Sequence, residues 1–83
     1  MPKVLIADDE PNIREVISFA LERAGFTTTT ARNGVEALQQ IRRAPPDLII
    51  LDIGMPEMDG LEVCRQLRKT SDVPILFLSA RDE

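Results

Sequence analysis

The chain has 83 residues, which is the length of one small domain. Hydrophobic residues make up 43% and charged residues 29%, values that exclude a disordered chain and a membrane-spanning one. The net charge of −4 and the lack of a basic run disfavour direct binding to nucleic acid. The sequence contains no histidine, so carboxylates are the main candidates for reactive chemistry. A single cysteine, Cys64, and the lack of an apolar targeting segment predict a cytoplasmic location.

The first half of the sequence predicts two strands separated by a helix. Residues 4–7 form a continuous apolar run that ends in two aspartates, as a buried parallel strand does. A helix follows, with Pro11 near its start and Gly25 just past its end. Its apolar positions recur at helical spacing: Ile13, Val16, Ile17, Ala20, Leu21 and Ala24. The threonine-rich residues 26–31 then predict a strand near the edge of a sheet.

The second half repeats this alternation of helix and strand. Asn33 is a suitable N-cap for a second helix, which the prolines at positions 45 and 46 bring to an end. Residues 48–51 predict an inner strand followed by Asp52, and residues 75–78 predict another inner strand. Between these strands, a third helix is predicted to present one apolar face: Leu61, Cys64 and Leu67. The order β-α-β-α-β-α-β is typical of an α/β fold with a parallel sheet and right-handed crossovers.

Four oxygen-bearing side chains stand at the carboxyl ends of the predicted inner strands: Asp8, Asp9, Asp52 and Ser79. In an open parallel sheet, ligands bind at this edge. Carboxylates that lie close together repel one another and favour a hard cation, and an open, wet site suits Mg²⁺ better than Ca²⁺. A magnesium site beside a carboxylate nucleophile predicts phosphoryl transfer through an aspartyl phosphate.

Three segments carry a resemblance to a known family: Ala7–Glu10, residues 51–60 (LDIGMPEMDG) and residues 77–81 (FLSAR). Together they resemble the receiver domain of bacterial two-component response regulators, and the resemblance runs from Lys3 to Glu83. It implies a flavodoxin-like, doubly wound parallel sheet with its strands in the order 2-1-3-4. The end of the chain is most similar to regulators that carry a winged-helix DNA-binding domain, which implies that the parent protein regulates transcription.

The resemblance also implies a role for each site residue. Asp52 would accept a phosphoryl group from a phosphohistidine of a sensor histidine kinase. Mg²⁺ would be held by Asp9 directly, by Asp8 mainly through water, by Asp52, and by the backbone carbonyl of Gly54. Ser79 would hydrogen-bond the phosphoryl group and act as the switch residue. A receiver is a regulatory domain rather than an enzyme, with at most self-catalysed phosphorylation and dephosphorylation.

The chain departs from the family pattern at its end. Receivers have five strands and five helices, so the resemblance predicts a partial receiver domain over residues 1–83, without the fifth strand and the last two helices. The family's fifth-strand lysine has no counterpart in this sequence, which predicts impaired phosphorylation. Without the fifth strand, residues 75–78 would form an exposed apolar edge, so we expect the fragment to self-associate or to swap elements with another copy.

Two other functions remain open. One is a signalling-inert receiver fragment that keeps the acidic Mg²⁺ pocket but self-associates through residues 75–78. The other is a dehalogenase-like Mg²⁺ phosphohydrolase, which also uses an aspartate at a strand end as its nucleophile. The pattern of that family has a second aspartate two residues later, where this chain has Gly54. The sequence therefore favours the receiver interpretation.

Overall fold

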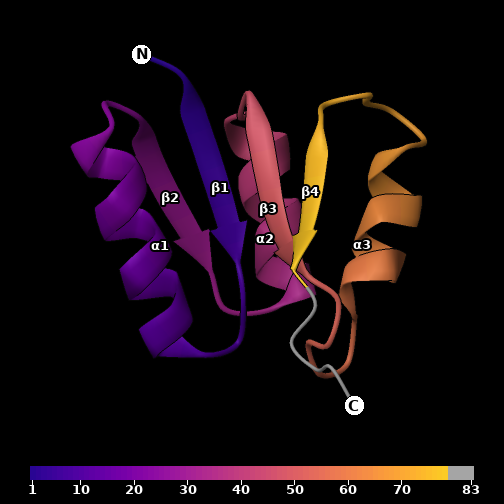
Figure 1. Cartoon of the computed structure of the whole chain (residues 1–83). Coiled ribbons are helices and arrows are strands. Elements are labelled where there is room, and N and C mark those ends of the chain that lie inside the picture. Colours follow the sequence, from indigo (N-terminus) through magenta and orange to yellow (C-terminus); the bar gives the residue numbers. More distant parts are fainter. Residues whose placement is uncertain (79–83) are drawn as a thin grey trace.

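The architecture is a four-stranded parallel sheet with helices on both faces. The computed structural model describes residues 1–78. The elements in chain order are β1 (Lys3–Ala7), α1 (Pro11–Arg23), β2 (Thr27–Ala31), α2 (Gly34–Arg43), β3 (Leu48–Asp52), α3 (Gly60–Leu67) and β4 (Ile75–Leu78). The strands lie in the order β2-β1-β3-β4, and every neighbouring pair is parallel. This arrangement confirms the doubly wound α/β fold predicted from the sequence (Figure 1).

The inner strands β1 and β3 are far more buried than the outer strands. Residues 4–7 of β1 and residues 49–52 of β3 are all buried, as expected for apolar runs that are covered on both faces. β2 forms one edge of the sheet, as its threonine-rich sequence predicts. Within residues 1–78, β4 forms the other edge rather than an inner strand, because β3 is its sole partner there.

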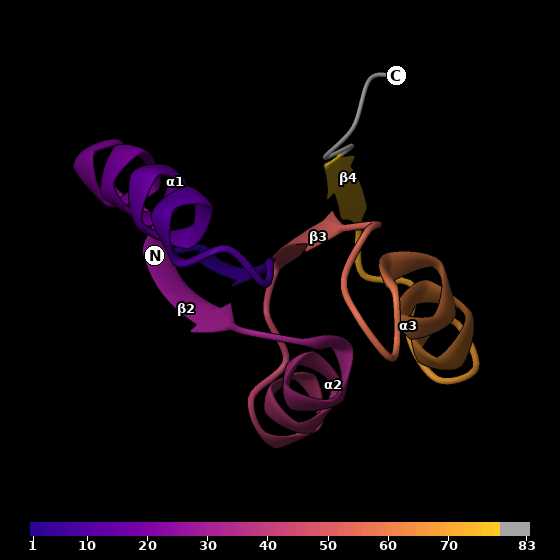
Figure 2. The ribbon, with the colours of Figure 1, turned by 90° about the horizontal axis from the view of Figure 1, so that it is seen from below.

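The sheet divides the core into two layers (Figure 2). Helices α2 and α3 lie on one face, and α1 lies on the other, over β1 and β2. The larger layer faces α2 and α3 and includes Leu5, Leu51 and Val63. The smaller layer faces α1 and is built on Val4, Ile6 and Ile50. Both layers hold β1 and β3 in place, and these two strands end at the predicted site.

Helix α1 buries only part of its predicted apolar face. Ile17 and Leu21 pack against the smaller core layer. Ile13 and Val16 are 40% and 66% exposed. The reason is that α1 lies over β1 and β2 and does not extend over the same face of β4 within the described residues (Figure 2). α1 has 13 residues and is the longest helix in this part of the chain, where no helix is long and apolar enough to cross a membrane.

The apolar face predicted for α3 is wrong in part. Leu67 is buried as predicted, but Val63 shares its face in place of Leu61, which is 50% exposed. Cys64 is only partly buried. Val63 packs against the start of α2, where its Cγ2 atom leaves no space for a side chain at Gly34. The orientation of α3 is therefore set by its contact with α2, which the spacing of apolar residues in α3 alone does not reveal.

Both α2 and α3 begin with a capping side chain. Oδ1 of Asn33 accepts a hydrogen bond from the N–H of Glu36 at 2.8 Å, which confirms the predicted N-cap of α2. Oδ1 of Asp59 accepts one from the N–H of Glu62 at 2.9 Å. Each bond satisfies an N–H group that the start of a helix leaves without an intrahelical partner. The caps therefore fix where the two helices begin.

Candidate functional site

The carboxyl ends of β1 and β3 bring three aspartates together. Asp8 and Asp9 directly follow β1, and Asp52 is the last residue of β3. The two strands are neighbours, with Ala7 level with Leu51 across the sheet. One carboxylate oxygen from each aspartate lies within 4.8 Å of the other two. Asp8 and Asp52 are buried, with 4% and 2% of their surface exposed, whereas Asp9 is exposed. We call these three residues the acidic cluster.

Asp8 is held by hydrogen bonds from three different elements. Its N–H donates to the carbonyl of Ala31 at the end of β2, at 3.1 Å. Its carboxylate Oδ1 accepts from the N–H of Glu10 in the following loop, at 2.8 Å. Its main-chain carbonyl accepts from Nη1 of Arg14 in α1, at 2.7 Å. The strand, the loop and the helix therefore all fix the position of this residue.

Asp52 is held by the turn that follows β3. The N–H of Gly54 donates to Oδ1 of Asp52 at 3.1 Å, so the side chain closes the turn. The N–H of Gly60 donates to the carbonyl of Ile53 at 3.1 Å and brings the start of α3 back against β3. A Cβ atom at Gly60 would overlap the main-chain carbonyl of Asp52, so only glycine permits this close approach.

The three carboxylates of the acidic cluster form none of the ion pairs found among residues 1–78. Burial raises the pKa of Asp8 above its ordinary value, and the hydrogen bond from the N–H of Glu10 lowers it again. Three negative neighbours raise the pKa of Asp8 further: Asp52, Asp9 and Glu10. The net shift of the Asp8 pKa is upward, because burial and the three negative neighbours outweigh the one hydrogen bond. Carboxylate oxygens grouped in this way are suitable ligands for Mg²⁺, which prefers a few carboxylates and water.

The structure brings together the three acidic residues that the sequence predicts, Asp8, Asp9 and Asp52. Gly54 lies beside them, but the bond that is seen is from its N–H to Asp52, and coordination through its carbonyl stays a prediction. Ser79 lies outside the described residues. The residue before it, Leu78, is level with Asp52 across the sheet.

Two features of the site were not predicted from the sequence. One is the bond from Arg14 to the carbonyl of Asp8. Its only signal is a cation one helical turn after Glu10, at a position where many surface cations have no special role. The other is the close approach of Gly60 to Asp52. Its signal is the sequence Asp-Gly-Leu-Glu from Asp59 onward, in which an N-cap residue precedes a glycine.

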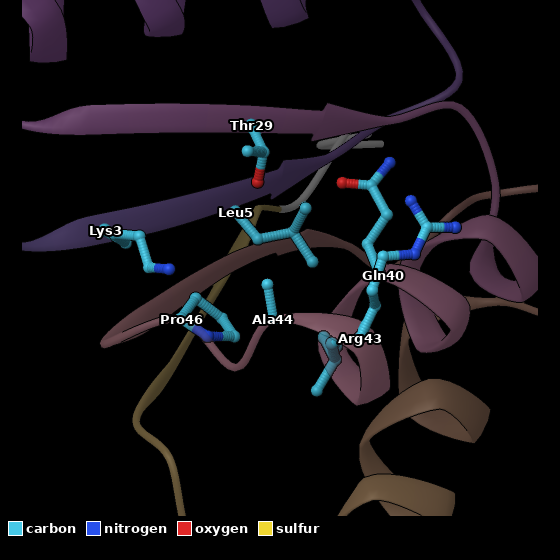
Figure 3. Close-up of a pocket in the computed structure, with 8 residues that line it drawn as sticks. Lys3, Leu5, Thr29, Gln40, Arg43, Ala44 and Pro46 are labelled. Atoms are coloured by element: carbon cyan, nitrogen blue, oxygen red, sulfur yellow. The ribbon is translucent and has the colours of Figure 1, made fainter.

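A separate hollow of about 160 Å³ lies near the opposite end of the strands (Figure 3). Lys3, Thr29, Gln40 and Arg43 surround it, and Leu5 contributes to its apolar lining. Lys3 begins β1 and Arg43 ends α2, so the hollow lies away from the acidic cluster. The partial negative charge at the carboxyl end of α2 opposes an anion there, so the two cations do not define a ligand site.

The chain belongs to the response regulator receiver family. The family model described as "Response regulator receiver domain" matches residues 4–83. Receiver domains bind Mg²⁺ through a cluster of aspartates, and Asp8, Asp9 and Asp52 form such a cluster here. They are regulatory domains rather than enzymes, and they pair with sensor histidine kinases.

Curated relatives of this chain are response regulators. Response regulator MprA of Mycobacterium ulcerans is 49% identical over 81 residues, which cover 96% of this chain and 35% of that protein. The alkaline phosphatase synthesis transcriptional regulatory protein PhoP of Bacillus subtilis is 46% identical over 82 residues, which cover 98% of this chain and 34% of that protein. The chain therefore spans about a third of the length of the curated relatives it matches.

Several solved structures share this fold. Chemotaxis protein CheY4 of Vibrio cholerae aligns with a TM-score of 0.93 and 40% identity, over 100% of this chain and 72% of that chain. TrrA of Thermotoga maritima, solved in complex with Mg²⁺ and BeF, aligns with a TM-score of 0.92 and 43% identity, over 99% of this chain and 72% of that chain. A complex of histidine kinase ThkA with TrrA aligns with a TM-score of 0.91 and 44% identity, over 100% of this chain and 72% of that chain.

Proposed function

We propose that Asp52 is the phosphoacceptor of a two-component signalling system and receives its phosphoryl group from a phosphohistidine on a sensor histidine kinase. The observation that carries this proposal is the convergence of Asp8, Asp9 and Asp52, with ligand oxygens within 4.8 Å of one another. Asp52 is the best placed nucleophile, because it ends an inner strand and is fixed by the turn that follows. The similarity to TrrA, which was solved with Mg²⁺ and BeF and also with a histidine kinase, supports the same assignment.

We propose that Mg²⁺ is held by Asp9 directly, by Asp8 mainly through water, by Asp52, and by the carbonyl of Gly54. When bound, the ion would neutralise negative charge on the phosphoryl oxygens. The exposed side chain of Asp9 is free to turn towards a ligand. Oδ1 of Asp8 is already engaged by the N–H of Glu10, which supports a contact through water for this residue.

The chemical step transfers one phosphoryl group between two side chains. A lone pair of an Asp52 carboxylate oxygen forms the new O–P bond. The N–P bond of the phosphohistidine breaks at the same time, and its electron pair stays on the imidazole nitrogen. Since Oδ1 of Asp52 accepts from Gly54, we assign the attack to Oδ2. The product is an acyl phosphate, which adds negative charge at the end of β3.

The added charge would act on the end of β4. Leu78 is level with Asp52, and its carbonyl accepts a hydrogen bond from Ile53 at 3.2 Å. Ser79 is the next residue along the chain, so its hydroxyl is our candidate to hydrogen-bond the phosphoryl group. This contact would bias the parent protein between an inactive and an active state and so regulate transcription.

The test uses Mg²⁺ with beryllofluoride as a phosphoryl mimic, and Mg²⁺ with acetyl phosphate as a donor. We expect wild-type amide NMR spectra to shift with the mimic, and the intact mass to rise by one phosphoryl group with the donor. Asp52→Asn should abolish both responses. Asp72→Asn is the matched control, because Asp72 is an exposed carboxylate in the segment before β4.

The other outcomes identify the alternatives. Mg²⁺ binding by the wild-type chain without either response would favour a signalling-inert receiver fragment. Release of many equivalents of inorganic phosphate from phosphate esters would favour a phosphohydrolase, although Gly54 stands where that chemistry needs a second aspartate.

We also propose that the 83-residue chain self-associates through β4. Leu76 and Phe77 are 56% and 39% exposed, and the described residues cover only one edge of this strand. An open strand edge that carries apolar side chains is a template for pairing with another chain. For this segment we propose no direct contact with nucleic acid, because its net charge is −4. The proposed location is the cytoplasm, where the single thiol of Cys64 would stay reduced.

A further inference from the structure

We propose that Arg14 is a positioning residue for the acidic cluster, a role that rests on the metal-binding function proposed above. Nη1 of Arg14 donates to the main-chain carbonyl of Asp8 at 2.7 Å, and the contact is partly buried. Arg14 is the fourth residue of α1, and its own N–H donates to the carbonyl of Glu10 at 3.2 Å. The side chain therefore reaches back from α1 onto the loop that holds two of the three aspartates.

The bond acts on Asp9 through the peptide group that joins it to Asp8. The carbonyl of Asp8 and the N–H of Asp9 belong to one rigid, planar unit. A hydrogen bond to the carbonyl oxygen of this unit restricts the orientation of the peptide plane, and so restricts the position of the Cα atom of Asp9. Arg14 thus sets the starting point of the Asp9 side chain without touching its carboxylate.

Asp9 needs this support more than the other two members of the cluster do. Asp8 and Asp52 are 4% and 2% exposed, so packing restricts their side chains. Asp8 is also held by Ala31 and by Glu10. Asp9 is exposed, and the bond from Arg14 to the preceding carbonyl connects its backbone to α1.

The contact is one of geometry and not of charge neutralisation. The ion pairs of residues 1–78 are Arg32 with Glu36 and Arg65 with Glu62, and neither includes Arg14. The guanidinium contacts a neutral carbonyl instead of a carboxylate. Its positive charge near the cluster would weaken the attraction for a cation. The two effects of Arg14 therefore have opposite signs: its charge lowers the affinity for Mg²⁺, and its hydrogen bond raises it.

This opposition makes Arg14→Met a sharp test, because methionine keeps the length and the helix propensity of the side chain but removes the charge and the donors. We expect Mg²⁺ affinity, measured by titration calorimetry, to fall by about tenfold, at the lower end of the loss seen when an outer partner of a metal ligand is removed. In the metal-free protein, the NMR order parameter of the Asp9 amide should fall as well. Arg14→Lys should recover part of the Mg²⁺ affinity and part of the Asp9 order parameter, since an ammonium group can donate to the same carbonyl.

Arg23→Met is the matched control. Arg23 lies at the other end of α1 and stacks over Phe19, with its guanidinium carbon 5.7 Å from the ring centre. This variant loses a surface cation of the same helix and should bind Mg²⁺ as the wild type does. Thermal melts of all variants without metal show whether each keeps its fold. If the methionine variant does not fold, Arg14→Ala replaces it, because alanine also favours a helix and also lacks the charge and the donors. Wild-type Mg²⁺ affinity in that variant would overturn the proposal.

Tighter Mg²⁺ binding by Arg14→Met would also overturn the proposal, because a purely electrostatic role gives that sign. Unchanged binding would overturn it too, because the proposal requires a loss. An unchanged Asp9 order parameter would overturn it too. If the wild-type chain binds no Mg²⁺, the proposed metal function fails. The order parameter of Asp9, which is measured without metal, still supports or overturns the positioning role in that case.

Discussion

The Cα atom of Gly60 lies against the main-chain carbonyl of Asp52, and a Cβ atom built there would overlap that oxygen and crowd the Cα atom of Ile53. Gly60→Ala must therefore push α3 away from β3 or displace the proposed phosphoacceptor. We expect weaker Mg²⁺ binding and a loss of about 1–3 kcal/mol in the free energy of unfolding, the usual effect of overpacking. Calorimetric titration and urea unfolding measure the two effects.

Gly25→Ala is the control for that prediction. Gly25 has a φ of 98°, a backbone conformation that residues with a side chain rarely adopt. A Cβ atom at this position would meet open space. We expect this variant to lose about 1–2 kcal/mol of stability through backbone strain alone, with unchanged Mg²⁺ affinity. If both alanine variants bind Mg²⁺ equally well, the contact between Gly60 and Asp52 does not set the geometry of the site.

The raised pKa of Asp8 makes the stability of the metal-free protein depend on pH. Because the folded state holds the proton more tightly than the unfolded state does, this residue's contribution is fully present below the ordinary carboxyl pKa. It is lost as the pH rises through the raised pKa of Asp8. Asp8→Asn keeps an oxygen acceptor for the N–H of Glu10 but cannot ionise. We therefore expect this variant to gain stability over the wild type as the pH increases.

Urea unfolding in the presence of a chelator, repeated from acidic to neutral pH, measures this difference. Only the gap between the wild type and Asp8→Asn is used, since other carboxylates titrate in the same range. Asp72→Asn, at an exposed site away from the cluster, serves as the reference. Parallel stability curves for the wild type and Asp8→Asn would contradict the prediction.

Mg²⁺ should stabilise the folded chain, because we propose that it binds the assembled cluster and not the unfolded chain. At a concentration of 100 times the dissociation constant, the gain is about 2.7 kcal/mol. Asp9→Asn should remove most of this gain. Because the side chain of Asp9 is exposed, the same variant should melt near the wild-type temperature without metal. Thermal melts with and without Mg²⁺ test both statements, and a full Mg²⁺ effect in Asp9→Asn would refute the proposed ligand role.

The caps of α2 and α3 should contribute similar free energies. Asn33→Ala and Asp59→Ala each remove a side-chain bond to the first turn of a helix, and we expect each to lower the free energy of unfolding by about 1 kcal/mol. Asn33→Asp keeps the acceptor and should be nearly neutral. Urea unfolding of the three variants makes the comparison. A cost for Asn33→Asp as large as that for Asn33→Ala would show that the side-chain bond is not what stabilises α2.

Self-association through β4 should be sensitive to charge at its exposed leucine. Leu76→Lys places a cation on the strand that we propose pairs between copies, so we expect a shift towards monomer in sedimentation velocity. Leu61→Lys is the matched control, since Leu61 is 50% exposed on α3 and Leu76 is 56% exposed. A monomer at high concentration in the wild type, or equal effects of both variants, would count against pairing through β4.

Local sequence signals were sufficient for most of the fold. The apolar runs at residues 4–7 and 48–51 defined the inner strands, because strands buried on both faces have no polar alternation. The cap at Asn33 was also predictable, since it depends on a bond to a residue three positions away. The acidic cluster followed because its members directly adjoin strands whose order the resemblance implied.

Contacts between elements distant in sequence could not be predicted in this way. Val63, and not Leu61, faces the core because α3 is oriented by its packing on α2 at Gly34. Ile13 and Val16 belong to a helix with the expected spacing, yet their exposure depends on where α1 lies over the sheet. The bond from Arg14 to Asp8 requires both a helix position and a loop conformation, and a single sequence specifies neither directly.

The two buried aspartates are connected by a second route besides the ladder between β1 and β3. The N–H of Asp8 donates a hydrogen bond to the carbonyl of Ala31, which lies three residues before Gly34. Gly34 packs closely on Met58, since a Cβ atom at Gly34 would lie 2.6 Å from the carbonyl oxygen of Met58. Met58 belongs to the loop that brings Gly60 against Asp52. Two independent sets of contacts, the ladder between β1 and β3 and the contacts through Gly34 and Met58, thus restrict the separation of the two carboxylates. The site is therefore preorganised. Binding of the ion should therefore need little rearrangement of the backbone, and the rate of binding should be limited by the loss of water from the hydrated ion.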